Sequence, residues 1–167
     1  NLPHIFFLWF LSLVLPMNIL RYVFTFLMHI TGGIGIFFLT KYLFKPKRWL
    51  SEPFIASLFY LFNPATIQMF YTPLEAFSVH FAALPWLTLT LLNYLSSGSK
   101  GTLTAFFFVA LVSAPQYFVT TLLLPVIFLL STISAVTFFH DTTKWKRICT
   151  AGFGFLFINA FWLLPYL

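Results

Sequence analysis

The chain alternates long apolar runs with short polar gaps, and its basic residues fall in every second gap. The gaps at residues 63–75 and 113–117 contain neither Lys nor Arg, and only Arg21 breaks the alternation. The basic gaps hold Lys41, Lys45, Lys47 and Arg48, then Lys100, then Lys144, Lys146 and Arg147. Because basic residues are retained on the cytoplasmic side of a bilayer, this pattern predicts a chain that crosses a membrane repeatedly in a defined orientation.

The apolar runs predict an all-α, polytopic transmembrane bundle. A spanning helix needs about 20 apolar residues, so a chain of 167 residues has room for about seven spans. The runs cover residues 5–15, 18–44, 53–62, 76–95, 102–112, 118–139 and 148–167. They are continuous rather than alternating, which favours helices over the strands of a lipid-facing barrel. A cytoplasmic N-terminus is predicted, because it leaves only Arg21 among the basic residues outside.

Two breaks within these runs carry structural information. Asn63-Pro64 ends the short helix predicted from Pro53 to Phe62, so residues 65–75 are expected to be a re-entrant or interfacial segment. Residues 113–116 separate either two helices of a hairpin or the halves of one kinked helix. Charge favours the hairpin, which puts Lys100 on the same side as the last basic gap.

Composition excludes a soluble protein and indicates a lipid environment. The chain is 60% hydrophobic and 7% charged, whereas a soluble domain has about 25% charged residues. Its net charge of +6 is interpreted as loop anchors facing anionic headgroups, so membrane lipids and not nucleic acids are the expected partners. Aromatic residues expected near the membrane interfaces are Trp49, Tyr71, Tyr117, Trp145, Trp162 and Tyr166.

The single cysteine, Cys149, excludes an internal disulfide and a cysteine zinc site. The chain opens on Asn1 rather than Met and leaves no room for a soluble domain. We therefore expect residues 1–167 to be one transmembrane region of a longer membrane protein.

Few residues can carry chemistry. Of the three acids, Glu52 and Asp141 lie in basic loops and are expected to balance local charge. Glu75 lies on the predicted outer side at the start of a span, where an ionisable group is a functional candidate. It could orient a substrate or pair with Arg21 or His80, or it could only stabilise a helix N-terminus. The candidate substrate-binding residues are Arg21, Gln68, Tyr71, Glu75, His80 and Gln116.

The remaining candidates are weaker. Arg21 could hold a lipid phosphate through its planar fork of donors, or be an ordinary interfacial arginine. His29 lies mid-span and is expected to hydrogen bond between helices rather than bind a metal. Gly32, Gly33 and Gly35 lack the strand context and third glycine of a nucleotide-binding fingerprint and predict either a close-packing helix face or a flexible point in the second span. No complete catalytic set and no metal site can be assembled from these residues.

Short motifs spread over most of the chain resemble segments of a known family of membrane enzymes. They are Tyr60-Leu61-Phe62-Asn63-Pro64, Glu75, Leu84-Pro85-Trp86, Ser113-Ala114-Pro115-Gln116 and Asn159-Ala160-Phe161-Trp162-Leu163-Leu164-Pro165. Together they resemble the middle of a multi-pass GT-C glycosyltransferase, similar to the large arabinofuranosyltransferase-like membrane proteins of bacteria. The resemblance implies a polyprenyl-phosphate sugar donor, a glycan or lipid acceptor, and transfer on the outer side of the prokaryotic plasma membrane.

The chain departs from that family in one respect. In such enzymes an Asp or Glu of the first outer loop acts as base or metal contact, but residues 16–22 contain no acid. That loop is therefore expected upstream of Asn1, and the resemblance leaves open a divalent metal in the full-length enzyme. One alternative is a transporter or lipid flippase, in which Asn63-Pro64 and Pro115 would break helices that line a path. Another is a purely structural membrane module.

Overall fold

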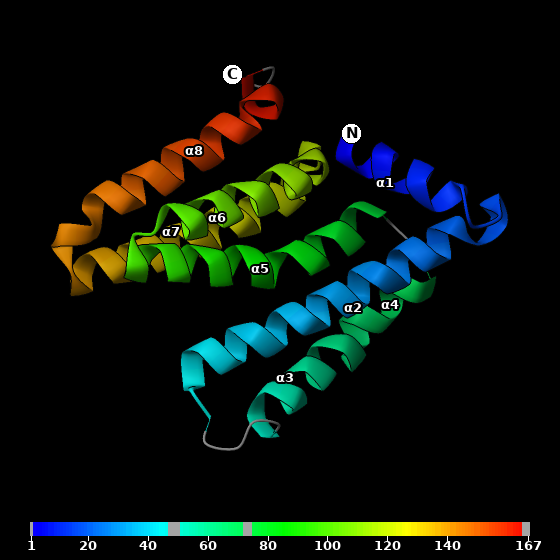
Figure 1. Cartoon of the computed structure of the whole chain (residues 1–167), viewed down its shortest axis with the longest axis horizontal. Coiled ribbons are helices and arrows are strands. Elements are labelled where there is room, and N and C mark those ends of the chain that lie inside the picture. The colour runs from blue at the N-terminus through cyan, green and yellow to red at the C-terminus, as the bar shows by residue number, and fades with distance from the viewer. Residues whose placement is uncertain (1, 47–50, 72–74, 165–167) are drawn as a thin grey trace. The chain divides into compact units, whose positions relative to one another are not determined.

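The computed structural model describes residues 2–46, 51–71 and 75–164 (Figure 1), and over these ranges the chain is helical with short connections and no strand. The helices are α1 (Leu2–Ser12), α2 (Met17–Phe44), α3 (Ser51–Phe62), α4 (Pro64–Tyr71), α5 (Glu75–Ser97), α6 (Lys100–Ser113), α7 (Thr120–His140) and α8 (Trp145–Leu163). Two 3₁₀ helices, η1 (Ala114–Phe118) and η2 (Thr142–Lys144), connect α6 to α7 and α7 to α8. The predicted all-α class is confirmed.

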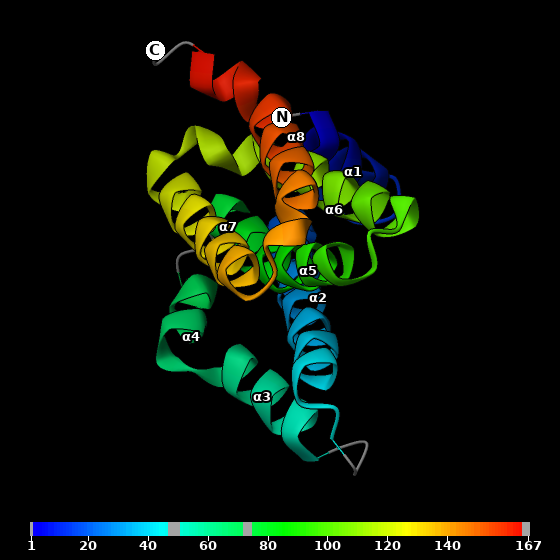
Figure 2. The ribbon, with the colours of Figure 1, turned by 90° about the vertical axis from the view of Figure 1, so that its left-hand side faces the viewer.

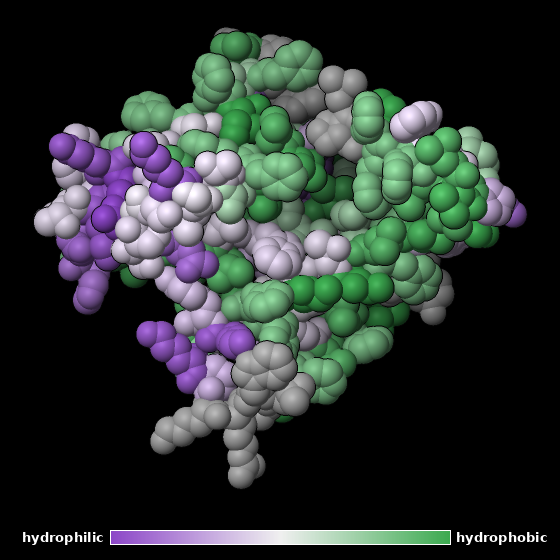
Figure 3. Space-filling view, in the orientation of Figure 1, coloured by the Kyte–Doolittle hydropathy of each residue, from purple (hydrophilic) through white to green (hydrophobic). Residues whose placement is uncertain are grey.

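Four segments of the described chain are long and apolar enough to cross a membrane. They are α2, α5, α6 together with η1, and α7. Apolar side chains also dominate the face shown in Figure 3, as expected where lipid rather than water surrounds the helices. These findings support an integral, multi-pass membrane protein. The number of spans stays a prediction, because α1 has 11 residues and α3 has 12.

The helix boundaries follow local sequence signals. Asn63 lies between α3 and α4, and its Oδ1 accepts a hydrogen bond from the backbone N–H of Thr66 at 3.1 Å. Pro64 is the first residue of α4, where its missing N–H costs nothing. Asn63 therefore acts as an N-cap, and the segment predicted as re-entrant or interfacial begins with a helix. At η1 the chain turns back on itself, so α6 and α7 form a hairpin (Figures 1 and 2).

The chain divides into two compact units, Asn1–Trp86 and Leu87–Leu167. The boundary falls within α5, directly after the helical turn that contains Pro85. The first half of α5 therefore belongs to unit 1 and its second half to unit 2.

In unit 1, α2 packs closely through its glycines. A Cβ on Gly32 would lie 2.7 Å from the Phe81 ring, and a Cβ on Gly33 would lie 2.9 Å from Leu61. Side chains of the neighbouring helices also donate to backbone carbonyls of α2: Ser57 Oγ to the Gly33 carbonyl at 2.9 Å, and Trp86 Nε1 to the Thr31 carbonyl at 3.0 Å. The predicted close-packing glycine face is confirmed, and such small-residue contacts are typical of helices that associate in lipid.

Replacing Gly32 is expected to destabilise unit 1. The Phe81 ring cannot move aside easily, because it stacks on Tyr60 with ring centroids 4.0 Å apart, and a Cβ on Gly32 would also lie 3.2 Å from the Phe81 carbonyl oxygen. Gly32→Ala should therefore lower the free energy of unfolding by about 1–3 kcal/mol through overpacking. Gly152→Ala is the matched control, since a Cβ there meets nothing within 4 Å. Melting temperatures in detergent would compare the two, and equal values would contradict the packing described.

In unit 2, α5, α6, α7 and α8 enclose an apolar core. Its most buried large side chains include Leu91, Phe106, Tyr117 and Val126. Tyr117, expected at a membrane interface, is only 1% exposed and packs against the Phe155 ring at a centroid distance of 6.0 Å. η1 therefore turns Tyr117 towards the core, and its depth relative to the membrane interface stays a prediction. Trp145 is 51% exposed, as an interfacial residue would be.

Candidate functional site

The residues that the structure brings together are Arg21 and Glu75, which are 54 positions apart in the sequence. Arg21 Nε donates to Glu75 Oε1 at 2.8 Å. The Arg21 side chain is 61% exposed and that of Glu75 is 25% exposed. Of the partners expected for Glu75, Arg21 is thus confirmed.

Local structure explains why these side chains meet. α2 begins at Met17, directly after Pro16, which places Arg21 in the second turn. Glu75 is the first residue of α5, where the unpaired backbone N–H groups of a helix favour a negative charge. Glu75 therefore fills two of its expected roles, since it stabilises the N-terminus of α5 and pairs with Arg21. Only the turnover of a Glu75 variant can show whether it also binds substrate.

Buried polar groups continue from this pair along both helices. On α2, Thr25 and His29 follow Arg21 at four-residue spacing and so share its face. Both are 2% exposed, and His29 Nδ1 donates to the Thr25 carbonyl at 2.8 Å. On α5, Ser78 is fully buried about one turn after Glu75. We call Arg21, Thr25, His29, Glu75 and Ser78 the polar stripe.

The contacts of His29 differ from the prediction, which was a hydrogen bond between helices. Its Nδ1 hydrogen bond stays within α2 rather than joining two helices. The His29 ring instead contacts α5 through the Phe81 ring, at a centroid distance of 5.0 Å. Thr25 Oγ1 is buried and has no hydrogen-bond partner among the described residues. A buried hydroxyl without a hydrogen-bond partner lowers the stability of a membrane protein. Its presence therefore indicates a position where a functional role can offset that cost.

The other predicted site residues are spread over the chain. Gln68 is exposed on α4, and Tyr71 is the last residue of that helix, with a side chain outside the described residues. His80 lies five residues after Glu75 on α5, about 140° around the helix from it, and its Nδ1 is buried without a hydrogen-bond partner in the described chain. Gln116 lies in η1 of unit 2. The structure shows Arg21 and Glu75 in direct contact, and the grouping of all six residues in one site stays a prediction.

Gln116 is buried in an unusual way. It is 3% exposed, and within the described part of the chain neither Oε1 nor Nε2 has a hydrogen-bond partner. Asn159 of α8 is fully buried, with Nδ2 donating to the Phe155 carbonyl at 2.8 Å and Oδ1 unpaired over the same residues.

Sequence reasoning did not single out several polar residues that the structure buries, among them Thr25, Ser78 and Asn159. Asn159 was noted only as part of a motif, and Thr25 and Ser78 were not noted at all. A signal existed for Thr25, because its spacing of four residues from both Arg21 and His29 places the three side chains on one helix face. No comparable spacing marks Asn159.

The resemblance leaves open a divalent metal in the full-length enzyme, and the described residues do not fit one. No three His, Cys, Asp or Glu side chains gather in the described ranges. Glu75 meets a guanidinium rather than a second carboxylate, and Mg²⁺ is held through carboxylate oxygens.

Comparison with known proteins adds no relative. No protein-family model, no curated protein and no solved structure matches this chain.

Proposed function

We propose that this chain is the transmembrane portion of a lipid-linked-sugar-dependent glycosyltransferase, and that it shapes an extracytoplasmic pocket for donor and acceptor. The observation that carries the proposal is the Arg21–Glu75 pair, an exposed guanidinium beside a half-buried carboxylate where two apolar helices begin. A guanidinium matches the geometry of a phosphate, and a carboxylate accepts hydrogen bonds from hydroxyls. A polyprenyl-phosphate sugar joins a phosphate and hydroxyls to a hydrocarbon tail, so it suits a site at this depth.

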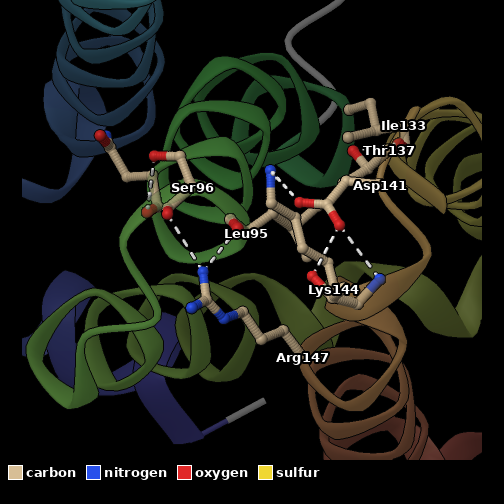
Figure 4. Close-up of polar contacts among 9 residues, drawn as sticks. Leu95, Ser96, Ile133, Thr137, Asp141, Lys144 and Arg147 are labelled. Carbon is tan, nitrogen blue, oxygen red and sulfur yellow. Dashed lines mark hydrogen bonds and ion pairs between the residues drawn. The ribbon is translucent and has the colours of Figure 1, made fainter.

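The proposed topology has seven spans and a cytoplasmic N-terminus. Arg147 Nη1 in α8 donates to the carbonyls of Leu95 and Ser96 at 2.9 and 3.0 Å, so the α5–α6 and α7–α8 turns share one end of unit 2 (Figure 4). That end carries the basic residues of two gaps, which supports a cytoplasmic location. Glu75 begins α5 and Ser97 ends it, and 23 residues span about 34 Å at 1.5 Å per residue. Glu75 and Arg21 then face the outer side.

In this site Arg21 binds the donor phosphate and Glu75 orients a hydroxyl of the sugar or of the glycan or lipid acceptor. The two roles are compatible, because a guanidinium carries five N–H donors in a fixed fork and can bind a carboxylate and a phosphate together. The buried hydroxyls of the polar stripe lie behind the pair and away from water.

Removing Arg21 is expected to weaken donor binding. Arg21→Ala in the full-length protein should raise the Kd for a polyprenyl-phosphate sugar by about tenfold to a hundredfold, because a hydrogen bond to a charged group contributes about 1.5–3 kcal/mol. The fold should survive, since Glu75 keeps access to water. Lys45→Ala, which removes an exposed positive charge from the end of α2, is the matched control and should leave the Kd unchanged. An unchanged Kd in Arg21→Ala would return Arg21 to an ordinary interfacial role.

A transporter or lipid flippase is the second candidate, and the two helix breaks favour it. The chain is interrupted at Asn63 between α3 and α4, and again at η1 between α6 and α7. Interrupted helices line the substrate path in many transporters. The full-length protein in sealed vesicles would then move a lipid between leaflets without a sugar donor, whereas a transferase would give a glycosylated product only when donor and acceptor are both present.

A further inference from the structure

The basic end of unit 2 is assembled from two turns that are distant in sequence. Arg147, near the start of α8, donates from Nη1 to the last turn of α5 through the Leu95 and Ser96 carbonyls (Figure 4). Carbonyls at a helix C-terminus lack partners in the helix and carry partial negative charge, so a cation is favourable there. One arginine therefore holds the α5–α6 turn against the start of α8.

Gly98 makes this contact feasible. Its φ is +66°, a backbone conformation that residues other than glycine rarely adopt, and a Cβ on Gly98 would lie 2.6 Å from Arg147 Cζ. The positive φ of the turn therefore favours glycine, and a Cβ there would displace the Arg147 guanidinium. Gly101 lies three residues later, and a Cβ on it would meet only Ser99 Oγ, at 3.6 Å.

The assembled end carries an excess of positive charge. Lys100 and Lys146 are exposed, one from each turn, and Lys146 Nζ lies 5.9 Å from the centroid of the Trp145 ring. Lys144 pairs with Asp141 at 3.5 Å. Hydrogen bonds from the Thr143 side chain and backbone hold the pKa of Asp141 below its ordinary value, so Asp141 is ionised at neutral pH. It offsets one charge only, and Figure 3 shows hydrophilic side chains gathered at this end of unit 2.

Apolar side chains border the charges directly. Phe139, at the end of α7, is 85% exposed, and Trp145 is 51% exposed beside Lys146. Large exposed aromatic residues next to lysines indicate the boundary between hydrocarbon and headgroups, where lysine and tryptophan anchor a membrane protein. A soluble anion would not need that apolar border.

We infer that Lys100, Lys144, Lys146 and Arg147 form one surface that binds the headgroups of anionic phospholipids, and that Arg147 and Gly98 assemble it from two turns. The lysines meet the lipid phosphate, while Arg147 acts as a positioning residue through the carbonyls of α5. This inference does not depend on the Arg21–Glu75 site or on the proposed transferase activity.

Lipid binding to the full chain in detergent tests this inference. Native mass spectrometry would give apparent Kd values for phosphatidylglycerol, which is anionic, and phosphatidylcholine, which has no net charge. Phosphatidylglycerol should bind preferentially, and Lys100→Gln and Lys146→Gln should each weaken it about fivefold, as expected for one basic residue at an anionic surface. The matched control is Lys45→Gln, which removes an exposed lysine from the end of α2. It should have a smaller effect, and an equal loss would overturn the assembled surface in favour of general attraction.

Gly98→Ala tests the assembly without removing a charge. It should weaken phosphatidylglycerol binding at least about fivefold, as much as losing one lysine, whereas Gly101→Ala should not. Unchanged binding in a folded Gly98→Ala protein would overturn the role of the two-turn contact, and if Gly98→Ala fails to fold, the lysine variants decide. Glycerol 3-phosphate is the soluble probe. It should not displace the lipid at equal concentration, and displacement would overturn the assignment to lipid.

Discussion

A reporter that works only in the cytoplasm is expected to be active when fused to the full-length protein after Arg48, Ser99 or Lys146, and inactive after Thr72 or Gln116. This is an all-or-none difference, because each fusion point lies on one side of the bilayer. Arg147 ties the α5–α6 and α7–α8 turns together at one end of unit 2. The fusions after Ser99 and Lys146 must therefore agree with each other.

A second reporter that works only outside the cytoplasm is the control for these fusions. It should give the opposite pattern at the same positions and so exclude poor expression as the cause of a silent fusion. The reverse orientation at every position would place Arg21 and Glu75 in the cytoplasm and remove the proposed donor site. Activity of one reporter after both Thr72 and Ser99 would mean that α5 does not span the membrane, and the seven-span topology would be wrong.

Helix ends were predictable because their signals are local. Pro16 precedes α2, Asn63-Pro64 separates α3 from α4, and the polar turn after Ser97 separates α5 from α6. Each of these signals acts through backbone geometry or capping within a few residues. The alternation of basic and non-basic gaps could also be read from the sequence, because it depends only on the positions of Lys and Arg along the chain.

The packing of side chains was not predictable in the same way. Helices that are apolar all round carry no periodic signal of which face is buried, so the sequence could not show that Tyr117 points inward. Arg147 was interpreted only as a basic loop residue, because its partners are backbone carbonyls of another helix. Only tertiary contact reveals such partners.

The candidate site was predictable in part. Its two charged members stood out because charges are rare in this chain, and pairing of Glu75 with Arg21 was one of the expected arrangements. The sequence could not choose between Arg21 and His80, since Arg21 is 54 residues from Glu75 and His80 is only five. The geometry of α5 excludes His80 as the partner, because a spacing of five residues places it on a different helix face from Glu75.

Glu75→Gln is expected to lower turnover of sugar transfer by tenfold or more while leaving stability nearly unchanged. If Glu75 orients a substrate hydroxyl, its negative charge acts in the transition state, and each tenfold in rate corresponds to about 1.4 kcal/mol of barrier. A role confined to the helix N-terminus and the ion pair would instead cost about 1 kcal/mol of stability at most and leave turnover intact. Glutamine keeps the size of the side chain, so packing is preserved.

Melting temperature and sugar transfer should be measured on the same purified full-length variant. Asp141→Asn is the matched control, because Asp141 is also an acid in an ion pair near a helix end, with Lys144 at 3.5 Å, but lies at the proposed cytoplasmic end. It should keep full turnover. A drop in turnover for Glu75→Gln alone, with similar melting temperatures for both variants, supports substrate positioning. Full turnover in Glu75→Gln would remove Glu75 from the site and leave the Arg21–Glu75 pair with a structural role, in which it joins the N-terminal ends of α2 and α5.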